Sequence, residues 1–185
     1  MSEKGGARDA SQVIANGGVY GALALTSILT GESLLIVPAI GAIAASTSDT
    51  WATEVGTLYS NSARSILTLR PVQAGTSGGI TFKGTMAAVA GAVFIAMLST
   101  ALALPVSSGA AALAGGIGGS LIDSVLGATI QSRRWCAPCG RETERTVHTC
   151  GGMTEHRRGM KWVDNDGVNL LGSLSGAALG ALCLL

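Results

Sequence analysis

Long uncharged stretches constrain the fold of this sequence more than any other feature. Charged residues are absent from four segments, residues 10–31, 33–48, 84–122 and 167–185. A helix needs about 20 apolar residues to cross the hydrocarbon core of a bilayer, so the third segment is long enough for two crossings if a break divides it. Pro105, followed by Ser107, Ser108 and Gly109, supplies that break.

These segments predict a single all-α domain, a polytopic transmembrane helix bundle. The sequence is 48% hydrophobic and only 12% charged, which lies outside the usual range of soluble domains. Five membrane-spanning helices are expected near residues 12–29, 33–50, 84–104, 108–131 and 167–185. Two sizeable cytoplasmic loops, residues 51–83 and 132–166, connect them.

The positive charges predict the orientation in the membrane. All 12 Lys and Arg residues lie in the segments 1–17, 49–83 and 131–166, which five alternating helices place on one side. Because loops rich in Lys and Arg stay on the cytoplasmic side, we predict a multi-pass protein of the cytoplasmic membrane with its amino terminus inside. The lipid bilayer is the expected partner. The net charge of +1 gives no indication of nucleic-acid binding, and none is expected.

Glycine is the most informative residue for the packing of the predicted helices. The chain holds 27 glycines, while aromatic residues make up 4%. Gly115 and Gly119, and later Gly172, Gly176 and Gly180, recur at spacings of four and form small-residue faces, which allow helices to approach closely. Such faces would serve a monomer or a dimer, so the oligomeric state stays open.

Two acidic residues interrupt the apolar pattern at the ends of the second and fourth predicted helices. Asp49 and Asp123 each follow a serine three positions earlier. The fourth helix carries a polar face with members three or four residues apart, namely Ser120, Asp123, Ser124, Gly127 and Gln131. Carboxylates at membrane depth usually face a protein interior or a wet cavity, so both aspartates are candidate functional residues. A helix end that simply reaches water is the alternative.

A glycine-rich turn lies in the loop at residues 51–83. It consists of Gly75, Thr76, Ser77, Gly78 and Gly79, with Lys83 shortly after it. Backbone N–H groups at such a turn and at a helix start can bind phosphate, and Lys83 would add positive charge. The Walker A pattern is absent, and a plain flexible turn is the alternative.

The loop at residues 132–166 contains four side chains that suit a soft metal. Cys136, Cys139, His148 and Cys150 follow the pattern Cys-x2-Cys-x8-His-x-Cys. Three thiolates and an imidazole fit tetrahedral Zn²⁺, and four protein ligands leave no open position, so a bound zinc would be structural. The spacing is shorter than in ordinary zinc fingers. A redox Cys-x-x-Cys pair and unligated thiols are the alternatives.

Polar residues also precede the fifth predicted helix. Asn165 and Asn169 are four residues apart and share a face, and Asp166 lies between them. Asn165 or Asp166 can cap the amino terminus of this helix, and capping is compatible with ligand binding.

Five motifs together resemble a family of integral membrane proteins long described as a domain of unknown function. They are residues 12–17, 48–56, 75–79, 123–131 and 164–169. The family includes phytyl-phosphate kinase of plants and cyanobacteria and an animal protein called transmembrane protein nineteen. Its members usually carry additional hydrophobic segments before the first motif, so an amino-terminally short form is expected.

The resemblance implies transfer of a phosphoryl group from a nucleoside triphosphate to an isoprenoid lipid phosphate at the cytoplasmic face. Such transfer needs oxygen ligands for Mg²⁺ and cationic or N–H groups for phosphate. Asp49, Glu54 and Asp123 are then assigned to Mg²⁺ or substrate contacts. The glycine-rich turn and Lys83 are assigned to phosphate, and the remaining polar residues, Gln131, Asn165, Asp166 and Asn169, to supporting the site.

One geometric condition limits this assignment. Asp49 and Glu54 are about 140° apart around an ideal helix, so they share a metal only if the helix ends between them.

A membrane transporter is the main alternative function, and a non-catalytic membrane protein is a further one. Polar residues beside glycine-rich helices would line a transport pathway. A transporter needs polar groups toward both membrane faces, whereas the polar motifs here gather on one side. That distribution favours an enzyme acting on an interfacial lipid.

Overall fold

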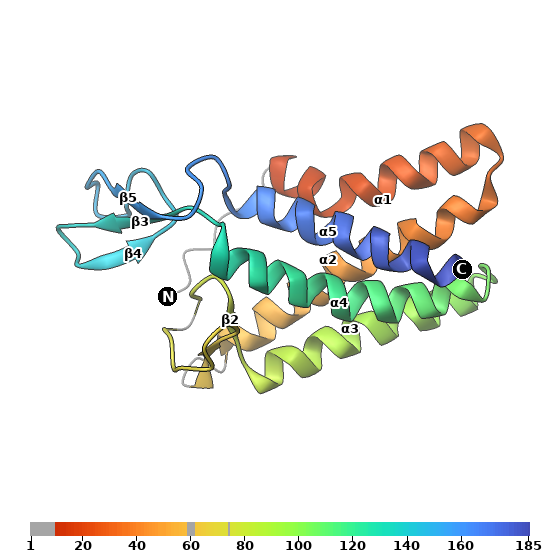
Figure 1. Cartoon of the computed structure of the whole chain (residues 1–185), viewed down its shortest axis with the longest axis horizontal. Coiled ribbons are helices and arrows are strands. Elements are labelled where there is room, and N and C mark those ends of the chain that lie inside the picture. Colours follow the sequence, from red (N-terminus) through yellow and green to blue (C-terminus); the bar gives the residue numbers. More distant parts are fainter. Residues whose placement is uncertain (1–9, 59–61, 74) are drawn as a thin grey trace.

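Five long helices form the body of the protein in a computed structural model that describes residues 10–58, 62–73 and 75–185 (Figure 1). The helices are α1 (Ala10–Thr30), α2 (Ile36–Leu58), α3 (Phe82–Ala101), α4 (Ser107–Thr129) and α5 (Asn165–Ala181). Short 3-10 turns, Ser33–Leu35 and Leu182–Leu184, adjoin α2 and α5. All five helices are long and apolar enough to cross a membrane, which confirms the predicted class of fold.

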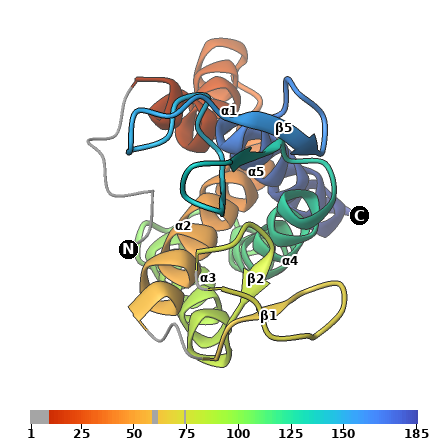
Figure 2. The same cartoon turned by 90° about the vertical axis from the view of Figure 1, so that its left-hand side faces the viewer.

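Helix α2 is the centre of the bundle. It packs against each of the other four helices, while α1 lies on α2 and α5, and α3 lies on α2 and α4 (Figure 2). The first half of α2 is almost completely buried, whereas Ala15 is the one residue of α1 that is buried. The side chains of α1 therefore form much of the apolar outer surface, which suits contact with lipid.

Glycines bring the backbones of α2, α4 and α5 into direct contact. A Cβ atom added to Gly115 would lie 2.6 Å from the Cα atom of Gly41 and 2.7 Å from the carbonyl oxygen of Gly176. Gly115 therefore has no room for a methyl group. The sequence prediction that these glycines serve helix packing is thereby confirmed for the junction of the three helices.

The two long connecting segments, between α2 and α3 and between α4 and α5, gather at one end of the bundle, called here the polar end (Figure 1). Two short strands, β1 (Arg64–Ser65) and β2 (Gly79–Ile80), pair in antiparallel fashion after α2. Between α4 and α5 lies a three-stranded antiparallel sheet, ordered β4-β3-β5. Its strands are β3 (Arg133–Cys136), β4 (Arg141–Thr143) and β5 (Glu155–Arg158). The sequence analysis did not predict these strands.

Helix α2 continues well beyond its predicted end at residue 50. It runs to Leu58, and its last turns pack on the start of α3, where Gly56 approaches Gly84. Asp49 and Glu54 therefore lie on one uninterrupted helix, about 140° apart around its axis. The condition under which they would share a metal is not met.

The start of α5 also differs in detail from the sequence interpretation. The capping residue is Asp164, whose Oδ1 accepts a hydrogen bond of 2.9 Å from the backbone N–H of Gly167. Asn165 and Asp166 are instead the first two residues of the helix.

The placement of the loops generates a test of membrane orientation. Val106, in the α3–α4 connection, is 98% exposed, and Thr68 is exposed at the polar end. In intact cells, a membrane-impermeant maleimide should label Val106→Cys directly, whereas Thr68→Cys should be labelled only after permeabilisation. The unsubstituted protein, which has cysteines of its own, gives the background labelling. Labelling of both residues from one side would contradict the predicted topology.

The glycine junction generates a test of packing. Gly115→Ala should lower the free energy of unfolding by about 1–3 kcal/mol, because the added methyl group overlaps backbone atoms of α2 and α5. Gly109→Ala, on the same helix, is the matched control because a Cβ atom there meets nothing within 4 Å. Thermal unfolding of both variants in detergent measures the difference. Equal stabilities would show that the junction tolerates a methyl group.

Candidate functional site

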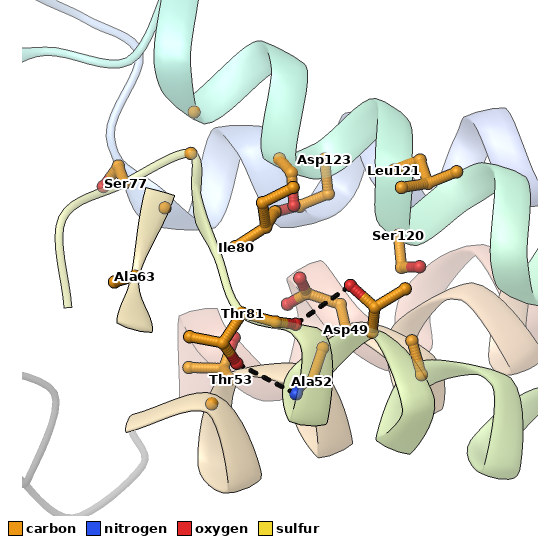
Figure 3. A pocket seen from close by; sticks show the side chains of 18 of the residues that line it. Asp49, Ala52, Thr53, Ala63, Ser77, Ile80, Thr81, Ser120, Leu121 and Asp123 are labelled. Carbon is orange, nitrogen blue, oxygen red and sulfur yellow. Dashed lines mark hydrogen bonds between the residues drawn. The ribbon is translucent and has the colours of Figure 1, made fainter. Parts of the chain in front are cut away.

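A water-accessible cavity opens at the polar end, between α2, α3, α4 and the segment that contains β1 and β2 (Figure 3). It offers about 120 Å³ to the centres of water-sized molecules. A single water needs about 10–15 Å³ on this measure, so the cavity has room for several waters, or for an ion or a phosphate group in their place.

Two carboxylates from different helices enter this cavity. Asp49 of α2 and Asp123 of α4 both line it, and Figure 3 shows them pointing into it from opposite sides. The Asp123 side chain lies against α5, where a Cβ atom on Gly172 would be 2.9 Å from Oδ2 of Asp123. The Asp123 carboxylate fits in this place because Gly172 has no side chain. The structure brings these two predicted residues together.

The glycine-rich turn forms a wall of the same cavity. Every residue from Gly75 to Gly79 lines it, and the backbone N–H of Gly79 closes the turn by donating to the carbonyl of Thr76 at 2.8 Å. Gly78 has a φ of 75°, and a Cβ atom there would overlap Ala128. Glycine is required at this position for two independent reasons, conformation and close approach to α4.

Amide and hydroxyl groups complete the lining. Gln131 and Asn165, both predicted site residues, lie along the cavity. Gln131 is 3% exposed, and its Nε2 has no hydrogen-bond partner among the described residues. A buried donor without a partner costs free energy, so an acceptor supplied by water or a ligand would stabilise this arrangement.

Four predicted residues are not brought to the cavity. Glu54 projects from the exposed side of α2, and Lys83 is exposed in the first turn of α3. Asp166 accepts a hydrogen bond from Ser11 of α1, and Asn169 lies one turn further along α5. None of the four belongs to the lining, because helix periodicity directs them to other faces.

The sequence analysis missed several lining residues on α2 and α3. Thr53, Gly56 and Thr57 follow Asp49 at helical spacing, so the periodicity would have indicated them had α2 been extended to Leu58. At the start of α3, Thr81 accepts a hydrogen bond from Gly84 at 2.9 Å, and the Thr85 hydroxyl donates to the Thr81 carbonyl at 3.0 Å (Figure 3).

A second candidate site lies in the sheet between α4 and α5. One ligand atom from each of Cys136, Cys139, His148 and Cys150 lies within 4.8 Å of the others. Sγ of Cys150 is 3.6 Å from Sγ of Cys136 and 3.2 Å from Nδ1 of His148. Tetrahedral zinc with bonds of about 2.3 Å separates sulfur ligands by about 3.8 Å. The predicted Cys3His cluster is thus assembled and could hold a metal ion such as zinc.

Hydrogen bonds within the cluster shift the pKa of two of its thiols in opposite directions. The hydrogen bond with His148 lowers the pKa of Cys150 to about 6, while the hydrogen bond with Cys150 raises the pKa of Cys139 to about 11. A thiolate is therefore favoured at Cys150, and the neighbouring thiol keeps its proton. Metal ligation requires deprotonated thiols, so binding of a metal ion to this cluster would release protons.

These features define a class of protein, an integral membrane protein of five helices with a polar cavity at one end. The model of the family "Integral membrane protein DUF92" matches residues 1–177. The chain belongs to this family.

Curated relatives of similar sequence are found in a plant and in prokaryotes. Protein PGR of Arabidopsis thaliana is 32% identical over 198 residues, which cover 93% of this chain and 67% of the relative. An uncharacterized membrane protein of Methanocaldococcus jannaschii is 31% identical over 175 residues, covering 95% of this chain and 62% of that protein. The chain thus spans about two thirds of the length of these relatives. No solved structure matches.

Proposed function

We propose that this chain is a membrane phosphotransferase, which moves a phosphoryl group from a nucleoside triphosphate to an isoprenoid lipid phosphate at the cytoplasmic face. The observation that carries the proposal is the meeting of Asp49, Asp123 and the glycine-rich turn in one cavity. Phosphoryl transfer requires oxygen ligands for a divalent cation beside groups that hold phosphate, and this cavity combines them.

The donor set of the cavity fits Mg²⁺. Two carboxylates from separate helices, with hydroxyl groups such as that of Ser120 nearby and room for water, are the hard oxygen ligands that Mg²⁺ prefers. Asp49 and Asp123 would hold the ion, which when bound neutralises charge on the phosphate oxygens. The glycine-rich turn and the amide of Gln131 would orient the phosphates by donating hydrogen bonds.

The reaction forms a diphosphate. An oxygen of the lipid phosphate attacks the γ-phosphorus of the nucleotide, the bond from that phosphorus to the β–γ bridging oxygen breaks, and the nucleoside diphosphate leaves with the electron pair. A phosphate oxygen is already ionised at neutral pH, so this step needs no general base. The contribution of the protein is to position the two phosphates and to stabilise their charge.

The apolar part of the cavity supports a lipid substrate. Val89 of α3 and Ile117 and Leu121 of α4 extend the lining away from the polar end. Ile117 lies about 18 Å from the end of α4 at 1.5 Å per residue, within the helix that is long and apolar enough to cross the membrane. Leu121 lines the cavity and is 43% exposed, so an isoprenoid tail could enter between α3 and α4 while its phosphate stays at the polar end.

A transporter has less support from this geometry. At the end of the bundle opposite the cavity, Glu32 is the one acidic side chain of the described residues, and it is exposed in the α1–α2 connection. Carboxylates that serve both membrane faces, as alternating access would use, are therefore not arranged along the bundle.

We also propose that the Cys3His cluster holds one structural zinc ion. Purified protein should contain about one zinc per chain, and Cys139→Ser should lose it, because three ligands bind far more weakly than four. Cys183→Ser is the matched control, since Cys183 lies in the turn after α5. Elemental analysis measures the metal. A metal-free protein with an unchanged fold would favour unligated thiols.

The proposed activity predicts a specific role for Asp123. Asp123→Asn keeps the size of the side chain and removes its charge, so it should reduce phosphoryl transfer about a hundredfold or more while leaving thermal stability unchanged. The assay supplies a prenyl monophosphate, Mg²⁺ and ATP or CTP, and detects the diphosphate. Glu32→Gln, at the opposite end of the bundle, should retain activity.

Two results would contradict the proposal. Full activity of Asp123→Asn would remove this residue from the site. Movement of a prenyl phosphate across liposomes containing the protein, without formation of diphosphate, would favour the transporter.

A further inference from the structure

The Cys3His lobe, defined as residues 132–164, contacts the cavity at the glycine-rich turn. From β3, the guanidinium of Arg133 donates a hydrogen bond to the backbone carbonyl of Ser77. Glu144, the residue that follows β4, accepts a hydrogen bond from the Ser77 hydroxyl. Two separate side chains of the lobe therefore hold one residue of the turn.

Arg133 is itself held in place by the lobe. Its side chain is 9% exposed and forms an ion pair of 3.3 Å with Glu142 of β4. A largely buried guanidinium is stable only when its N–H donors have acceptors. The contact of Arg133 with the Ser77 carbonyl and its ion pair with Glu142 are therefore coupled, because both are made by the same side chain. A shift of β4 relative to β3 would disturb both contacts.

The lobe lacks an apolar core that could keep β3 and β4 in register. Within residues 132–164, the buried hydrophobic residues are Cys136 and Val163, and Cys136 belongs to the metal cluster. A unit of this size without a hydrophobic core needs a disulfide or a metal to fix its conformation. Its cysteines form no disulfide, so a metal at the Cys3His cluster would add a cross-link to the strand pairing.

The cluster lies where it can fix both contacts to Ser77. Cys136 and Cys139 are in β3 and the β3–β4 turn, three and six residues after Arg133. His148 and Cys150 follow Glu144 in the next loop. Binding of one ion ties the strand that carries Arg133 to the segment that carries Glu144.

We propose that the metal-filled lobe is a positioning element for the glycine-rich turn, so that metal occupancy controls the affinity of the cavity for a phosphate group. The link from metal to turn rests on the contacts above, and the consequence for phosphate rests on the proposed function. Arg133 and Glu144 act through Ser77 as positioning residues. The base of the lobe is closed independently of the metal, since Ser132 N–H donates to the Val163 carbonyl at 2.7 Å.

Hydrogen exchange of the full chain in lipid nanodiscs tests the link without any assay of activity. Removal of the metal with a chelator should speed exchange of the amides at residues 76–80 about tenfold or more, and added Zn²⁺ should restore protection. Arg133→Met, with its metal retained, should cause similar acceleration at the turn. Arg141→Met is the matched control because Arg141 is exposed on β4 and lies outside the contacts to Ser77. Exchange at the turn that stays within twofold after metal removal, or in Arg133→Met, would overturn the link.

Kinetics test the second part of the inference. Arg133→Met should raise KM for the prenyl monophosphate about tenfold with a smaller change in kcat, because the turn is displaced while Asp49 and Asp123 remain. An unchanged KM alongside faster exchange would overturn the control of phosphate affinity. Metal-dependent exchange in a protein that transfers no phosphoryl group would support the link and reject the proposed function, so the two failures are distinguishable.

Discussion

Direct backbone contact at Gly41, Gly115 and Gly176 is the constraint on which the rest of the structure depends. In lipid, helices gain little from burying apolar side chains, so close van der Waals packing has to hold them together. Small residues permit that packing and fix α2 at the centre of the bundle. Since α2 carries Asp49 and α4 carries Asp123, the junction also determines that two carboxylates meet at one end.

The polar end shows how a membrane protein accommodates charge at the edge of the hydrocarbon. Asp49 and Asp123 point into a water-accessible cavity, and the glycine-rich turn lines the same cavity. Carboxylates that line a wet cavity can keep their solvation at the edge of the hydrocarbon.

The predictions that succeeded depend on composition and spacing within short segments. Charge-free stretches indicated the five helices, and the positions of Cys136 through Cys150 indicated a cluster whose four ligand groups do meet. Features set by contacts between distant segments were missed. The extension of α2 depends on Gly56 packing against Gly84, and β1 exists because Arg64 pairs with Ile80. No local pattern encodes either contact, and two-residue strands lack enough residues for a periodic signal.

The chain enters and leaves the Cys3His lobe at neighbouring points, since Ser132 and Val163 are joined by a backbone hydrogen bond. An inserted unit with adjacent ends can change in length without moving the elements on either side of it. Helices α4 and α5 are held side by side by their own packing. The lobe is only the chain segment that joins them. Because the helices do not depend on the lobe for their packing, the lobe could be replaced by a different domain while the helix bundle stays intact.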